Sequence, residues 1–136
     1  LKQAPVHWRL FWRDDQTLHS HVALTELDIE LDDQPMTVGA FGGLFTPPHL
    51  QGRVFATTLM DQAEVFVFDH LKLPLGLLFC LPELVPFYTA RHWTNVTRPV
   101  TLEQETSTVT WGGAVMIMNP DRVQNALSKI HVPLHH

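Results

Sequence analysis

Apolar and polar residues alternate along the first third of the chain, and this alternation is typical of β-strands. It extends over residues 7–13, 17–31 and 36–46, and polar clusters at 14–16 and 32–35 predict turns between these runs. Three strands joined by short turns predict an antiparallel meander.

The second of these runs changes the parity of its apolar residues. Val22 and Leu24 share one face of the strand, whereas the apolar residues from Leu27 onward lie on the other face. The change falls near Thr25 and Glu26 and indicates either a bulge or a change of the buried face.

A helical pattern follows the third strand. Apolar residues recur at spacings of four, four and three, which places one apolar stripe along a helix over 54–70. These residues are Phe55, Leu59, Ala63 and Phe66. The short apolar run at 75–80 then predicts a strand that is buried on both faces.

The rest of the chain predicts short elements. We expect a short helix over 82–91, strands over 93–102 and 112–118, and a last helix that starts at Asn119 and includes Ile130, followed by a tail. The fold class is mixed α/β, with a mostly antiparallel sheet flanked by helices. Residues 1–136 form a single domain, with its core at about 8–118 and the C-terminal helix and tail at 119–136.

The segment from Gly42 to Ala63 combines a strand, a turn and a helix N-terminus. The first N–H groups of a helix lack internal partners and carry partial positive charge, so they favour anions. Arg53 in the turn adds a full positive charge. The segment therefore predicts a site for a pyrophosphate group.

The turn resembles the acyl-CoA loop of the GNAT N-acetyltransferase superfamily, whose pattern is Q/R-x-x-G-x-G/A. Gln51 and Ala56 match the two ends of this pattern, and Val54 replaces its middle glycine. A β-branched residue resists positive φ, so we expect either ordinary helical dihedrals at Val54 or a lower cofactor affinity.

A second stretch is similar to the GNAT pattern F-Y-x-x-x-G-F/W. Phe87, Tyr88 and Trp93 match it, and His92 replaces a glycine that ends a helix in the left-handed region. The resemblance implies that Tyr88, the only tyrosine of the chain, protonates the departing CoA thiolate. The order of elements is similar to the GNAT core from its second strand onward, and this implies a GNAT fold without the usual first strand and two helices.

The resemblance also implies the residues that hold acetyl-CoA, with no metal. The backbone after the third strand pairs with the pantetheine arm, and the amides of the loop hold the pyrophosphate. The implied binding residues are Leu44, Phe45, Thr46, Gln51, Gly52, Arg53, Val54, Phe55, Ala56 and Phe87.

The acceptor amine needs a base. Glu26 is the first candidate because it lies where the strand changes parity, and His19, His21 and Asp28 are alternatives. His19 and His21 are two metal-type ligands without a third, so no metal site is predicted. The apolar surroundings of Cys80 keep a thiol protonated, which argues against a nucleophile.

The composition of the chain limits the classes of binding partner that we expect. The chain has 136 residues, 45% of them hydrophobic, and a net charge of -5, which fits one globular domain. Basic residues are few and scattered, so a nucleic-acid partner is not expected. No apolar run reaches the roughly 18 residues of a membrane span. Cys80 is the only cysteine, which fits a reducing compartment such as the cytoplasm.

The expected function is transfer of an acetyl group from acetyl-CoA to a primary amine of a small molecule, by direct attack with both substrates bound. The segment at 82–88 also resembles the aminoglycoside 2′-N-acetyltransferase-like branch. Two alternatives stay open. One is a non-catalytic or truncated GNAT-like domain that binds CoA weakly or not at all. The other is a homodimer formed through the exposed first strand, with Trp8, Phe11 and Trp12 at its surface.

Overall fold

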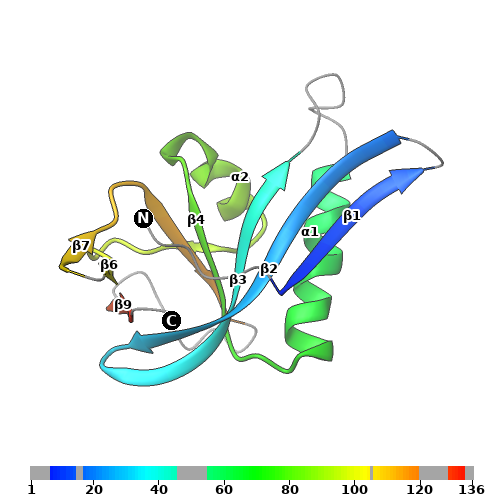
Figure 1. Cartoon of the computed structure of the whole chain (residues 1–136). Helices are drawn as coiled ribbons and strands as arrows, with labels where there is room; N and C mark the ends of the chain where they lie inside the picture. Colours follow the sequence, from blue (N-terminus) through cyan, green and yellow to red (C-terminus); the bar gives the residue numbers. More distant parts are fainter. Residues whose placement is uncertain (1–6, 15–16, 46–54, 105, 120–128, 134–136) are drawn as a thin grey trace.

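The computed structural model describes residues 7–14, 17–45, 55–104, 106–119 and 129–133, with only the backbone at 12–14, 17–19, 43–45 and 55–56. Within these residues, nine strands form one strongly curved sheet in the order β5-β8-β4-β3-β2-β9-β6-β7, and β1 pairs with β2 (Figure 1). The strands are β1 (Trp8–Asp14), β2 (Thr17–Leu31), β3 (Gln34–Phe45), β4 (Gly76–Cys80), β5 (Thr94–Asn95), β6 (Thr101–Glu103), β7 (Thr108–Thr110), β8 (Ala114–Met118) and β9 (Ile130–Val132).

The predicted antiparallel meander is confirmed as β1, β2 and β3. Asp32 and Asp33 form the two-residue turn between β2 and β3 with φ values of 49° and 67°. Both positions need positive φ in this kind of hairpin turn, and aspartate tolerates it better than most residues. The predicted turn was too long, because Gln34 and Pro35 already pair in the ladder.

The parity change in β2 is a change of the buried face. Pairing between β2 and β3 is continuous from Ala23 to Leu31, so no bulge lies near Thr25 and Glu26. The register instead shifts between His21 and Ala23. His21 pairs with Phe45 and Ala23 pairs with Gly42, so β3 has one residue more than β2 between these two pairs. This extra residue is a bulge near the end of β3.

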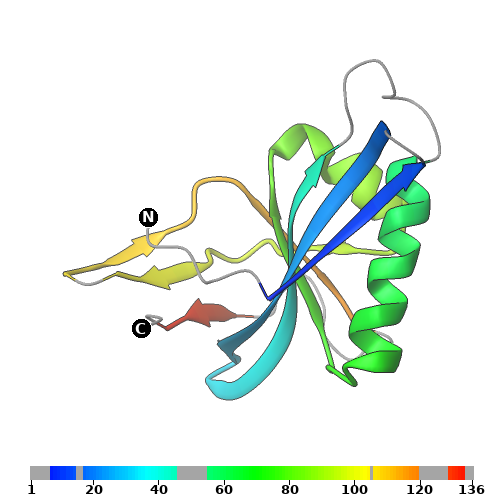
Figure 2. The same cartoon turned by 45° about the vertical axis from the view of Figure 1, so that its right-hand side comes forward.

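The long predicted helix at 54–70 is confirmed from residue 55 onward. It consists of α1 (Phe55–Val65) and the π-helical turn η2 (Phe66–His70). This helix connects β3 to β4, which pair in parallel, as a crossover helix allows. Figure 2 shows α1 lying along one side of the sheet.

Two buried clusters lie on opposite faces of the sheet. One forms where α1 covers Val22, Leu24 and Phe41, and it includes Leu78, Tyr88 and Trp93. The other contains Leu27, Ile29, Leu31, Leu77 and Ile117. Leu77 and Leu78 belong to different clusters and are both buried, which confirms that β4 is buried on both faces.

The second half of the chain departs from the predicted elements. The short helix is confirmed as η3 (Pro82–Leu84) followed by α2 (Val85–Ala90). The strand predicted over 93–102 is two separate strands, β5 and β6, with Pro99 in the segment between them. β7 and β9 were missed.

The predicted C-terminal helix falls mainly on residues 120–128, which lie outside the described residues. Ile130 was expected on that helix, but it lies in β9 and pairs with Leu31. Three-residue strands such as β7 and β9 are too short to show a period in sequence, and they form because the curved sheet offers them a partner edge.

Gly39 gives a test of this packing. A Cβ atom there would lie 2.5 Å from Val67 Cγ1 in η2, and we expect Gly39→Ala to lower the free energy of unfolding by about 1–3 kcal/mol through overpacking. Gly112→Ala is the matched control, because no atom lies within 4 Å of its added Cβ. Urea denaturation measures both, and equal stabilities would show that η2 does not approach β3 this closely.

Candidate functional site

Strands β3 and β4 separate at one end of the sheet. They pair in parallel from Gly39 and Gly76 to Phe41 and Leu78 and no further, although β3 continues to Phe45. Figure 1 shows the two strands diverging from this point. Within the part of the chain that the structure describes, each strand therefore presents an unpaired backbone edge toward the gap.

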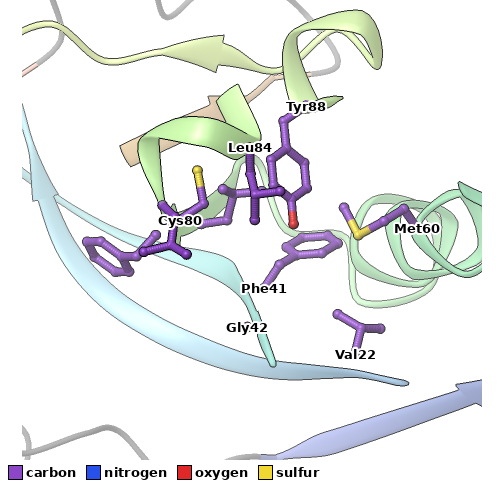
Figure 3. A pocket seen from close by; sticks show the side chains of 10 residues that line it. Val22, Phe41, Gly42, Met60, Cys80, Leu84 and Tyr88 are labelled. Atoms are coloured by element: carbon purple, nitrogen blue, oxygen red, sulfur yellow. The ribbon is translucent and has the colours of Figure 1, made fainter. Parts of the chain in front are cut away.

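A cavity of about 210 Å³ lies at this separation (Figure 3). Side chains from β2, β3, α1, β4, η3 and α2 line it, and most of them are apolar. The lining residues are Val22, Phe41, Gly42, Met60, Leu78, Phe79, Cys80, Leu81, Leu84 and Tyr88. Val22 is 0% and Met60 1% exposed, so the most deeply buried side chains of the lining are apolar.

Tyr88 supplies the phenol of this cavity. The residue is 5% exposed, and its hydroxyl points into the cavity between Phe41 and Met60 (Figure 3). Burial raises the pKa of Tyr88 to about 12, the neighbouring Cys80 adds to this, and Arg91 opposes it. The phenol is therefore protonated at neutral pH and can donate a proton.

Cys80 supplies the thiol of the cavity. Burial raises the pKa of this thiol, and the Glu83 carboxylate raises it further. A protonated thiol is a poor nucleophile, so the cavity offers a proton donor in Tyr88 rather than an attacking sulfur.

Helix α1 starts at the end of the sheet where β3 and β4 diverge (Figure 1). Met60, near its first turn, lines the cavity. The unpaired N–H groups of the helix start therefore lie within a few residues of the cavity. Of the predicted loop, Phe55 and Ala56 begin α1, whereas Thr46, Gln51, Gly52, Arg53 and Val54 lie outside the described residues.

Leu44 and Phe45 lie where the resemblance implied a backbone edge. Both belong to β3 beyond its last pair with β4, and Phe45 pairs on its other side with His21. The bulge lies in the same stretch. The backbone of β3 is therefore free to pair with a ligand in the gap, while β2 holds its other edge.

The structure does not bring Glu26 to the cavity. Glu26 is exposed on β2, four residues and about 14 Å along the strand from the cavity residue Val22. Its backbone N–H donates to His7 Nδ1 at 3.0 Å. Of the alternatives, Asp28 is exposed and accepts a hydrogen bond from Thr37 Oγ1 at 2.7 Å, and His21 lies 3.3 Å from Arg9.

The segment around Tyr88 fits the predicted motif. His92 has a φ of 74°, so it adopts the left-handed conformation that a glycine usually provides after a helix. Phe87 lies outside the cavity lining and packs edge-on against Tyr88 with ring centroids 5.0 Å apart. Trp93 is buried against Phe41 at 5.1 Å. Phe87 and Trp93 thus contact residues of the lining without belonging to it.

Solved structures with the same architecture include Escherichia coli ElaA, with a TM-score of 0.59 at 15% identity over 80% of this chain and 65% of that chain. The Bacillus subtilis N-acetyltransferase YlbP in complex with coenzyme A gives 0.61 at 14% identity over 83% and 68%. The Vibrio cholerae spermidine/spermine N-acetyltransferase SpeG, solved with manganese ions, gives 0.56 at 20% identity over 85% and 69%.

The chain has the GNAT acyl-CoA N-acyltransferase fold. No family model and no curated protein matches it. The chain spans 65% of the length of ElaA and a similar share of the other two proteins. The fold class expected from the sequence is thus confirmed.

Several lining residues of this GNAT-fold cavity were missed from the sequence. Val22, Phe41 and Met60 are ordinary apolar positions of strands and a helix, so nothing in their spacing marks them. Gly42 carried the one usable signal, since a glycine in a strand often marks a bulge or a close approach. Among the described residues, no atom lies within 4 Å of a Cβ built on Gly42, which leaves space beside the cavity.

Neither a metal centre nor a membrane-spanning helix is found among the described residues. No group of three or more His, Cys, Asp or Glu side chains is arranged to hold a metal ion there. Among the helices in that part of the chain, none is both long and apolar enough to cross a membrane.

Alkaline titration tests the burial of Tyr88. Its pKa of about 12 lies above the value of about 10 for an exposed phenol. We therefore expect tyrosinate absorbance to appear near pH 12 in the folded chain and near pH 10 in urea. Stability should fall between these values, because the unfolded chain releases its phenol proton first. A folded-state midpoint near 10 would contradict the buried phenol.

Proposed function

We propose that the chain is an acetyl-CoA-dependent N-acetyltransferase that acts on a primary amine of a small molecule. The observation that carries this proposal is the buried phenol of Tyr88 in an apolar cavity at the point where parallel strands separate. The GNAT fold and the coenzyme A complex of YlbP support it.

The cavity has a suitable size and lining for the thioester end of the donor. A dry cavity of about 150 Å³ holds a molecule as large as benzene, and this one measures about 210 Å³. The acetyl group, the sulfur and the adjoining carbons need a comparable volume. The apolar floor around Val22 and Met60 suits the acetyl methyl group.

The backbone beside the gap suits the pantetheine arm. An extended ligand with amide groups can pair with an unpaired strand edge, as an added strand does. Leu44, Phe45 and Thr46 would provide that edge, and the amides of residues 51–56 would hold the pyrophosphate at the start of α1. Arg53 would add its charge.

The roles of the residues follow from the chemistry. Acetyl-CoA supplies an activated acetyl thioester. Backbone N–H groups of the β3 bulge would polarise the thioester carbonyl while the amine nitrogen forms its bond to that carbon. Tyr88 would donate its proton to the sulfur as the carbon–sulfur bond breaks. Holding both substrates together supplies much of the rate.

The amine proton must leave as well. Glu26 is our proposed acceptor of that proton, through a chain of water molecules, because it is exposed on the strand that carries Val22. SpeG acts on spermidine and spermine, which supports an amine acceptor here. The net charge of -5 favours a cationic acceptor, of which aminoglycosides are one class.

Binding of acetyl-CoA is the first test. Calorimetric titration should give a dissociation constant in the micromolar range, about -8 kcal/mol. Gly42→Leu should abolish binding, because Gly42 lines the cavity and a leucine side chain there would occupy space that the ligand needs. The change should cost little stability, because no described atom lies within 4 Å of the added Cβ. Gly112→Leu adds the same bulk at an exposed position outside the cavity lining and should bind normally.

Two outcomes would change the proposal. No binding at millimolar acetyl-CoA would favour the alternative of a non-catalytic GNAT-like domain. Normal binding by Gly42→Leu would show that the ligand does not use this cavity.

Tyr88→Phe tests the acid. It keeps the ring and its packing and removes the proton donor, so we expect turnover with an amine panel to fall on the order of a hundredfold, with the KM for acetyl-CoA unchanged. Thr89→Ala, an exposed neighbour on α2, is the control. Steady-state kinetics measures both, and equal turnover in Tyr88→Phe and the parent chain would remove Tyr88 as the acid.

A further inference from the structure

A partly buried ion-pair cluster connects the residue after α2 to α1. Arg91, directly after α2, forms ion pairs with Asp61 and, at 3.4 Å between Nη2 and Oε2, with Glu64. Asp61 and Glu64 are three residues apart and therefore share one face of α1. The side chains of Arg91 and Glu64 are only 14% and 16% exposed, so this contact lies largely out of water.

The cluster is joined directly to Tyr88. The carbonyl oxygen of Tyr88 accepts hydrogen bonds from the backbone N–H groups of Arg91 at 3.0 Å and Trp93 at 3.1 Å. Arg91 therefore lies within one helical turn of Tyr88 along the chain. On the opposite side, Asp61 follows Met60, which lines the cavity next to the phenol.

Helix α2 needs such an anchor. It has six residues, and a helix this short is not stable without tertiary contacts. Pro86 occupies its first turn and no side chain caps its start. The ion pairs and the packing of Tyr88 against Trp93 hold its C-terminal end.

The partly buried charges of Arg91 and Glu64 stabilise each other. Burial raises the pKa of Glu64, and the charge of Arg91 opposes that rise. Removing Arg91 would leave a buried carboxylate without its cation, which is strongly unfavourable. The groups whose charges shift the pKa of the Tyr88 phenol are Cys80 in β4 and Arg91 directly after α2.

We propose that Arg91 is a positioning residue that holds the Tyr88 hydroxyl in the cavity by tying α2 to the carboxylates of α1. This inference rests on the proposed role of Tyr88 as the acid. It assigns to Asp61 and Glu64 the task of fixing the distance between the phenol and the helix whose start would bind the cofactor.

The experiment combines kinetics with a spectroscopic signal. Arg91→Met removes the charge and keeps an apolar stem, and Arg98→Met is the matched control, because Arg98 is exposed between β5 and β6. We expect Arg91→Met to lower kcat on the order of tenfold through misplacement of the acid, with the KM for acetyl-CoA unchanged and with no change in Arg98→Met. Arg91→Met combined with Tyr88→Phe should be no slower than Tyr88→Phe alone.

The single tyrosine of the chain provides the readout that does not need activity. In protein labelled at the phenolic carbon of tyrosine, one carbon resonance reports Tyr88. It should shift or broaden in Arg91→Met and stay unchanged in Arg98→Met. If Arg91→Met fails to fold, Glu64→Gln, which keeps the shape of the side chain, replaces it in both measurements.

Two results would overturn the positioning role. One is an unchanged tyrosine resonance in Arg91→Met. The other is an equal further loss of kcat when Arg91→Met is added to Tyr88→Phe, since Arg91 would then act on something other than the phenol. If the parent chain shows no turnover, the proposed function fails and the resonance alone decides whether Arg91 positions Tyr88.

Discussion

The parallel pairing of β3 with β4 over three residue pairs is the constraint on which the candidate site depends. A fourth pair would close the sheet and leave no space between the strands. Because the ladder ends at Phe41 and Leu78, both strands keep an unpaired edge, and side chains of the α1 face line a cavity at that point. The bulge of β3 lies beyond the end of this ladder, and a bulge bends the strand that carries it.

The curvature of the sheet explains why one strand serves two cores. The first half of β2 pairs with β1 and packs under α1, and the second half pairs with β9 and buries the opposite face. A strand of 15 residues twists and coils enough to present different faces to different neighbours. Glu26 is exposed because it lies beyond the part of β2 that α1 covers at Val22 and Leu24.

The apolar surroundings of the cavity keep its two titratable side chains protonated. Tyr88 is buried among Phe41, Met60 and Leu84, and this desolvation keeps its phenol protonated. The same apolar setting keeps Cys80 protonated. The cavity therefore presents a donor to a developing negative charge and offers no competing nucleophile. The ion pairs of Arg91 lie outside the cavity lining. They link the residue after α2 to α1 without adding charge to that lining.

Local patterns in the sequence determined the longer elements. Alternation predicted β1, β2 and β3, the helical stripe predicted the segment from Phe55 to His70, and the aspartates of the β2–β3 hairpin predicted its turn. The motif around Tyr88 also located a buried phenol and a left-handed residue at His92. These features depend on residues close in the chain, so the sequence carries their signal.

Only the tertiary structure decided where β3 and β4 separate, which apolar residues line the cavity, and where β7 and β9 pair. Val22, Met60 and Leu84 become neighbours through the curvature of the sheet and the crossover of α1. Arg91 meets Asp61 and Glu64 across 30 and 27 positions of the chain. Contacts of this kind depend on how distant segments pack, and no period or spacing in the sequence records them.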